Sequence, residues 1–117
     1  MNWYKTTQLR KFLGYKIVGL KKDTRQAYSI YSKEPINISI GSVTGFNGEG
    51  LFLGTSKDFC LDYYSCGTLD EDDELLLTYE YNQQDIIQGD PNSMNGEIQV
   101  KKGVLVNIEP VDKERYG

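Results

Sequence analysis

The sequence has 117 residues: 13 are Lys or Arg, 17 are Asp or Glu, two are Cys and none is His. This length predicts a single domain over residues 1–117, and 38% apolar with 26% charged residues is typical of a folded domain. The lack of histidine excludes Ser-His-Asp and Cys-His catalysis as well as mixed Cys/His zinc sites. No apolar run reaches the ~18 residues of a membrane helix and no signal peptide is evident, so we expect a cytoplasmic protein without a membrane partner.

Charge is unevenly distributed along the chain. Residues 1–33 hold eight cations and one anion, residues 34–99 hold one cation and thirteen anions, and residues 100–117 hold four cations and three anions. We expect the basic and acidic segments to neutralise each other within the fold. Nucleic-acid binding through the basic third is an alternative that the net charge of −4 disfavours. Its residues would be Lys11, Lys16, Lys21, Lys22 and Arg25.

The first half of the chain predicts one helix and three strands. A helix is expected over 6–14, because Leu9, Phe12 and Leu13 are spaced i, i+3, i+4 and Gly14 is a typical helix stop. Residues 15–20 and 27–31 are expected to be paired strands. Alternating isoleucines predict a half-buried strand over 36–40, and the glycines that follow predict a loop over 41–50.

The middle of the chain predicts a short strand over 51–53 and the best helix, over 55–66. Thr55 is the expected helix cap, and Asp58 follows three residues later, as in a capping box. Cys60 is interpreted as a small apolar residue of this helix rather than as a reactive thiol. Residues 70–74 are expected to form an acidic surface loop.

The last third predicts three more strands. A strong one is expected over 75–81, and residues 97–100 and 104–108 are expected to form a hairpin joined by Lys101-Lys102-Gly103. Residues 110–117 are expected to form a flexible tail. The chain therefore predicts a β-rich α+β domain, with a mainly antiparallel sheet of about six or seven short strands and two short helices.

Two sets of residues are candidate binding sites. One is expected to contact a protein partner through exposed carboxylates and a helix tyrosine: Asp70, Glu71, Asp72, Asp73, Glu74 and Tyr64. The other offers hydroxyls, an ammonium group and backbone N–H groups at a helix start, which can bind an anion or simply cap the helix: Thr55, Ser56 and Lys57.

No catalytic, metal or cofactor site is predicted. The acidic run lacks the alternate ligands, glycine and terminal glutamate of a calcium loop. Glu80, between two tyrosines, is the best lone acid, but we expect it to face water on the polar side of its strand.

One resemblance covers about half the chain. Residues 50–59, running into Tyr63-Tyr64 and followed by 75–81 and 97–108, resemble a layout of small phage and mobile-element proteins. The order is also similar to minimal ADP-ribosyltransferase-like domains. The sequence departs from those enzymes: it has no His for the His-Tyr-Glu class and no Glu-x-Glu pair for the Arg-Ser-Glu class. The resemblance therefore implies a scaffold without the enzymes' activity.

The favoured function is that of a small non-catalytic binding protein, such as a phage or prophage accessory factor that docks on a host protein and inhibits it. The first alternative is an ADP-ribosyltransferase-like or nucleotide-binding domain that uses Glu80 and hydroxyls near Ser42 or Thr55. The second is nucleic-acid binding. We expect a monomer or a homodimer, since an open sheet leaves a strand edge for pairing.

Overall fold

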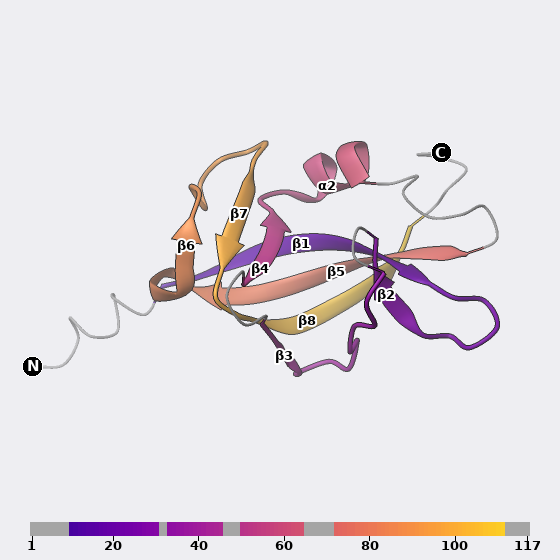
Figure 1. Ribbon diagram of the computed structural model, residues 1–117. Helices are drawn as coiled ribbons and strands as arrows, with labels where there is room; N and C mark the ends of the chain where they lie inside the picture. The colour runs from indigo at the N-terminus through magenta and orange to yellow at the C-terminus, as the bar shows by residue number, and fades with distance from the viewer. Residues whose placement is uncertain (1–9, 31–32, 46–49, 65–71, 112–117) are drawn as a thin grey trace, which may run out of the picture.

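The computed structural model describes residues 10–30, 33–45, 50–64 and 72–111. Eight described strands form one antiparallel sheet in the order β3-β8-β5-β1-β4-β7-β6, and β2 pairs with β1 (Figure 1). The β-rich antiparallel fold predicted from the sequence is thus confirmed, with a different strand count. The elements are β1 (Lys11–Leu20), β2 (Ala27–Ser29), β3 (Val43–Thr44), β4 (Leu51–Gly54), α2 (Lys57–Tyr64), β5 (Asp73–Asn82), the 3-10 turn η1 (Gln83–Asp85), β6 (Ile86–Gln88), β7 (Glu97–Val100) and β8 (Gly103–Pro110).

Strands β1 and β5 form the centre of the sheet. They pair over ten positions, from Lys11 opposite Asn82 to Leu20 opposite Asp73. The predicted helix over 6–14 is therefore wrong for residues 11–14, while 6–9 lie outside the described residues. Gly14 has a role other than a helix stop: a Cβ atom there would lie 2.6 Å from the Leu53 side chain. This glycine lets β4 approach β1 closely.

The sheet bends where β1 meets β4, because only Tyr15 and Gly54 are in register between them. Beyond this point β4, β7 and β6 cross in front of the long strands β1, β5 and β8 (Figure 1). Apolar side chains of the two layers interdigitate, as in orthogonal sheet packing. The largest side chains that are completely buried there are Tyr79, Leu51, Leu53, Leu77, Ile98 and Leu105.

The two C-terminal strands exist as predicted, but they do not form a hairpin. β7 pairs with β4 and β6, whereas β8 pairs with β5 and β3. Lys101 and Lys102 therefore connect the two layers. The predicted tail also begins too early, since Pro110 belongs to β8 and the Val111 N–H donates to the Glu74 carbonyl at 3.0 Å. Residues 112–117 lie outside the described residues.

The alternating isoleucines of 36–40 do not form a named strand. Only Pro35 bridges to Tyr28, and the Ile36 N–H donates to the Ala27 carbonyl at 3.0 Å. Ile36 is buried in the core, whereas Ile40 is 60% exposed. The alternation thus marks side chains that reach the core at Ile36 and Ile38 but not at Ile40, and the backbone leaves the sheet after Ile36.

Helix α2 covers part of the second face of the sheet, which we call the outer face because it points away from the main core. The Ser56 hydroxyl accepts a hydrogen bond from the Phe59 N–H at 3.1 Å, so Ser56 caps the helix, one residue after the predicted Thr55. Cys60 packs on Ile17 and Leu76, both on the outer face. The prediction of Cys60 as a buried apolar residue of this helix is confirmed.

Candidate functional site

The predicted acidic contact set is not one exposed cluster. The Tyr28 hydroxyl donates to the Asp72 carboxylate at 2.5 Å, and the Arg25 guanidinium pairs with Asp73 at 3.2 Å. Glu74 is only 2% exposed, so its prediction as a surface contact is wrong. It lies within β5, where backbone pairing with β1 places its side chain among packed neighbours. Asp70 and Glu71 lie outside the described residues, and Tyr64 is the last residue of α2.

Burial and the neighbouring carboxylate act together on Tyr28. Burial, the hydrogen bond to Asp72 and the nearby negative charges raise the pKa of Tyr28 to about 12. The contact therefore keeps the phenol neutral and fixes the Asp72 carboxylate against β2. These acidic groups hold the β1–β2 hairpin to the sheet.

The three predicted anion-binding residues all have partners within the fold. Thr55 exchanges two hydrogen bonds with Gly96, through its N–H at 2.9 Å and its Oγ1 at 3.1 Å. Ser56 caps α2, and the Lys57 ammonium lies 2.8 Å from the Glu109 carboxylate. A bound anion would have to displace Glu109, so this arrangement favours capping over anion binding.

The cations of the basic third do not form one patch. Lys11 pairs with Glu80 at 3.4 Å at one end of β1, whereas Lys21 and Lys22 follow the other end. Ten extended residues place these ends roughly 30 Å apart. Between them, burial lowers the pKa of Lys16. Arg25 is engaged with Asp73, which agrees with the expected neutralisation of opposite charges within the fold.

Groups with catalytic potential are also dispersed. Glu80 is exposed and paired with Lys11, whereas the Ser42 hydroxyl is buried. Burial raises the pKa of the Cys60 thiol to about 11, which keeps it protonated at neutral pH. In residues 10–30, 33–45, 50–64 and 72–111, no three His, Cys, Asp or Glu side chains gather in a way that could hold a metal ion.

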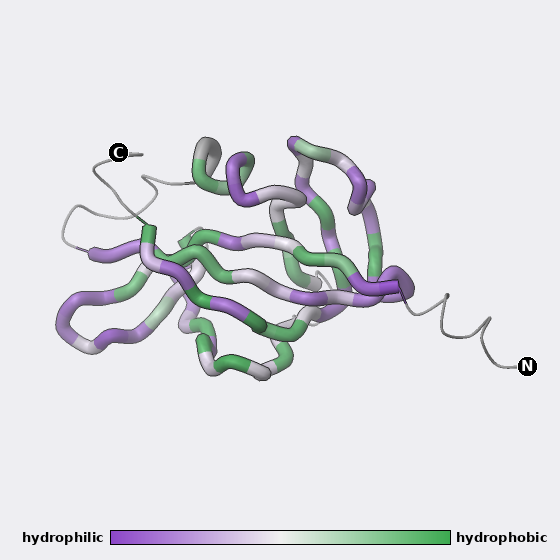
Figure 2. Tube along the Cα trace, turned by 180° about the vertical axis from the view of Figure 1, so that it is seen from behind, coloured by the Kyte–Doolittle hydropathy of each residue, from purple (hydrophilic) through white to green (hydrophobic). Residues whose placement is uncertain are grey.

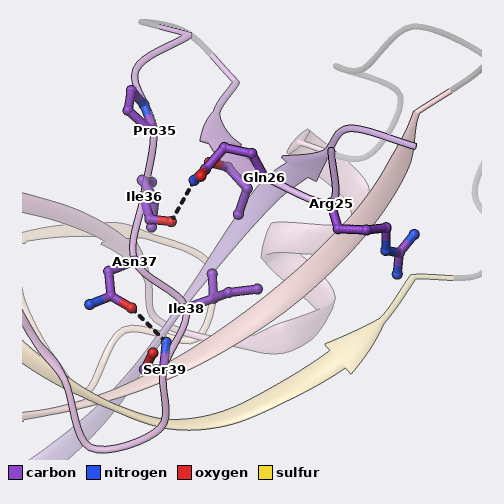
Figure 3. A pocket seen from close by; sticks show the side chains of 8 residues that line it. Arg25, Gln26, Pro35, Ile36, Asn37, Ile38 and Ser39 are labelled. Atoms are coloured by element: carbon purple, nitrogen blue, oxygen red, sulfur yellow. Dashed lines mark hydrogen bonds between the residues drawn. The ribbon is translucent and has the colours of Figure 1, made fainter. Parts of the chain in front are cut away.

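A shallow hollow of about 420 Å³ lies between the β1–β2 turn and the segment that follows Pro35 (Figure 3). Its polar groups are occupied locally: Gln26 Nε2 donates to the Ile36 carbonyl at 3.4 Å, and the Ser39 N–H donates to Asn37 Oδ1 at 2.9 Å. The Arg25 side chain extends away from the segment. The walls of the hollow are partly polar and partly apolar, and no charged side chains converge on it. Its lining residues are Arg25, Gln26, Ala27, Pro35, Ile36, Asn37, Ile38 and Ser39.

A row of three apolar side chains and one carboxylate crosses a part of the outer face that α2 does not cover. Register pairs connect Leu13 to Glu80, Glu80 to Val104 and Val104 to Val43, across strands β1, β5, β8 and β3. Directly opposed residues of antiparallel strands project from the same face. Leu13 is 48% and Val43 63% exposed. We call Leu13, Glu80, Val104 and Val43 the outer row.

Helix α2 lies over a different row of the same face. It packs on Ile17 and Leu76, and Lys57 reaches Glu109, the residue opposite Leu76 on β8. The outer row lies on the same face, four residues from this site along β1 and β5: Leu13 against Ile17 on β1, and Glu80 against Leu76 on β5. Figure 2, which views the sheet from behind, shows apolar residues along the long strands below α2. Val106, at a bulge of β8, adds a third exposed apolar side chain.

The outer row was not among the predicted site residues. Leu13 was assigned to a helix and Val43 to a glycine-rich loop. The one sequence signal that points to this face is Glu80, whose expected exposure on the polar side of its strand agrees with the structure. The register that brings the other three beside it has no local signature.

Comparisons of the chain with protein-family models, curated proteins and solved structures find no match. The resemblance to phage accessory proteins and ADP-ribosyltransferase-like domains therefore stays a prediction. Within the part of the chain that the structure describes, no helix has the length and apolar character to cross a membrane.

Proposed function

We propose that this protein is a small non-catalytic binding protein that docks on a partner protein through the outer row. The observation that carries the proposal is the outer row itself, in which Leu13 and Val43 are about half exposed and which no named helix of the described residues covers. Val104 and Val43 are directly opposed, Glu80 separates them from Leu13, and exposed apolar surface rimmed by polar residues is typical of protein interaction sites.

The dispersal of the reactive groups also supports binding rather than catalysis. A carboxylate general acid acts with partners within hydrogen-bonding reach, and among the described residues Glu80 forms an ion pair with Lys11, at 3.4 Å. Of the two hydroxyls expected to act with Glu80, that of Ser42 is buried and that of Thr55 accepts a hydrogen bond from the Gly96 N–H at 3.1 Å, while the Glu80 side chain is 39% exposed. This arrangement gives little support to the ADP-ribosyltransferase-like alternative.

A sheet surface of this kind suits a protein partner of modest affinity. Four strands spaced about 4.8 Å apart give a row roughly 14 Å wide, which is smaller than a standard protein interface. We therefore expect the partner to contact the neighbouring loops as well. Aliphatic side chains such as Leu13 and Val104 supply apolar contact area at the centre of such an interface.

Two matched double variants test this proposal. Leu13→Gln with Val43→Gln removes the apolar contacts of the outer row without changing charge. Phe52→Gln with Met94→Gln makes the same chemical change at two other exposed apolar residues, which are 42% and 80% exposed. All four positions are at least partly exposed, so each change should alter the free energy of unfolding by about 1 kcal/mol or less.

The immobilised variants are compared in capture of partners from a bacterial lysate, with cross-linking at lysines to locate the contact. We expect the wild type and the Phe52/Met94 variant to retain the same partner, cross-linked through Lys11 or Lys102, and the Leu13/Val43 variant to lose it. Equal capture by both variants, or cross-links confined to Lys21 and Lys22, would show that the outer row is not the contact surface.

A further inference from the structure

We infer that the outer row recognises an acidic protein segment that carries apolar side chains. This inference rests on the proposed function and specifies the chemistry of the partner. The observation behind it is a set of exposed cations close to the row, Lys11, Lys101 and Lys102. Arg10 is next to them in the sequence, but its guanidinium lies 5.0 Å from the centre of the Phe12 ring, on the opposite face of β1.

The backbone brings these cations together around the turn η1. The Arg10 carbonyl accepts a hydrogen bond from the Gln83 N–H at 2.9 Å, and the Lys101 N–H donates to the Asp85 carbonyl at 2.8 Å. Gln83 and Asp85 are the first and last residues of η1. Two cations thus flank a three-residue turn, although they are far apart in the sequence.

The other two cations lie next to the outer row. Lys11 precedes Leu13 by two residues on β1, so the two side chains share a face. Lys102 comes directly before β8, two residues ahead of Val104. The row therefore has Glu80 and Val104 at its centre and Leu13 and Val43 at its two ends, with the ammonium groups of Lys11 and Lys102 beside it.

Few carboxylates of the described residues oppose these charges. Glu80 pairs with Lys11, and the Asp85 side chain is 8% exposed and lies within hydrogen-bonding distance of Asn82. Asp72 and Asp73, in contrast, are engaged at the other end of β5 with Tyr28 and Arg25. The charges assigned to the contact here are thus opposite in sign to those of the sequence prediction, which placed the contact on acidic residues.

Aliphatic neighbours favour a peptide over a nucleic acid. Bases stack on aromatic side chains, and the outer row offers Leu and Val instead. The protein's net charge of −4 also repels a long polyanion at a distance. A short acidic segment with apolar side chains matches both parts of the surface, since its carboxylates face the lysines while its apolar groups cover Leu13 and Val43.

Peptide display on the immobilised full chain tests the inference directly. A phage library of random twelve-residue peptides is selected on the wild type, and the enriched peptides are assayed on two charge-matched variants. Lys101→Glu with Lys102→Glu reverses charge beside the row, and Lys21→Glu with Lys22→Glu makes the same change at the β1–β2 turn. Exposed ion pairs are worth about 1.5- to 5-fold each in affinity, so reversal of two should weaken binding roughly tenfold or more.

The inference predicts enriched peptides with net negative charge and at least two apolar residues, weakened by the Lys101/Lys102 change and not by the Lys21/Lys22 change. Neutral or basic enriched peptides that the Leu13→Gln, Val43→Gln variant fails to bind would overturn the acidic partner while leaving the docking face intact. No enrichment, or equal binding by all variants, would overturn both.

A labelled 20-base-pair DNA duplex and an oligo-thymidine of the same length serve as the competing probe. We expect no binding below about 10 μM at 150 mM salt. Tighter binding that falls steeply with salt and is lost on the Lys101→Glu, Lys102→Glu change would assign the cations to nucleic acid and overturn the inference.

Discussion

The contact between Gly19 and Tyr28 gives a sharp test of the register between β1 and β2. The two residues are directly opposed, and a Cβ atom added to Gly19 would lie 2.3 Å from Cζ and 2.6 Å from Oη of Tyr28. A tyrosine ring across a strand glycine replaces the packing that the glycine lacks. Gly19→Ala must therefore displace the ring and break its 2.5 Å hydrogen bond to Asp72.

The expected cost of Gly19→Ala is about 2–4 kcal/mol of unfolding free energy. Overpacking a well-packed site costs about 1–3 kcal/mol, and the lost hydrogen bond adds about 1 kcal/mol. At an unfolding entropy of about 2.1 cal/mol/K per residue, each 1 kcal/mol lowers the Tm of a chain this size by about 4 °C. We therefore expect Tm to fall by roughly 8–16 °C, measured by circular dichroism together with urea unfolding.

A double-mutant cycle separates this clash from a general intolerance of change at Gly19. In a Tyr28→Leu background the ring is absent, so Gly19→Ala should cost less than about 1 kcal/mol, with a coupling of at least about 1 kcal/mol. If Gly19→Ala costs the same in both backgrounds, or is neutral in the wild type, the ring does not cover Gly19 and this account of the hairpin is wrong.

Three further predictions concern titration, thiol reactivity and capping. Burial raises the pKa of Tyr28 and of Tyr81 to about 12 from the usual 10, so the stability they contribute is complete below pH 10 and is lost as pH rises to 12. Between pH 10 and pH 12 the midpoint of urea unfolding should fall less for Tyr81→Phe than for the wild type, and an equal fall in the two proteins would contradict this. Cys60 is 0% exposed, so in a Cys66→Ser variant its thiol should react with Ellman's reagent at pH 8 only as fast as the protein unfolds. Rapid reaction of the folded variant would refute the burial of Cys60. Ser56→Ala should lower the unfolding free energy by about 1 kcal/mol and Ser56→Asp should restore most of it, whereas an unchanged Ala variant would exclude Ser56 as the cap.

Strand identity was predictable from the sequence where side-chain alternation and backbone pairing coincide. Residues 75–81 are an example: Leu77, Tyr79 and Tyr81 reach the core, and β5 pairs on both edges. Residues 36–40 have an equally clear alternation, but the β-bridge of this segment joins Pro35, just before them, to Tyr28, and none of 36–40 belongs to a named strand. Here the alternation reports core contact for Ile36 and Ile38 but not for the exposed Ile40, and it does not require a hydrogen-bonded ladder.

The elements that the sequence predicts wrongly and the outer row that it misses have one cause: both depend on pairing between strands that are far apart in the sequence. Phe12 and Leu13 fit a helical period as well as a strand, and only pairing with Tyr81 and Glu80 of β5 decides between them. The predicted hairpin failed for the same reason, since each of its strands finds a better partner in a different layer. The outer row combines residues from four such strands, so no local pattern contained it.

Hydrogen–deuterium exchange with the captured partner bound is the most direct test of the docking surface. Amides of residues 11–15, of Val43 and Thr44, and of 103–106 should exchange more slowly in the complex, while those of α2 and β2 keep their free rates. Slower exchange confined to α2 or to the β1–β2 hairpin, with the first half of β1 unchanged, would show that the protein binds its partner elsewhere.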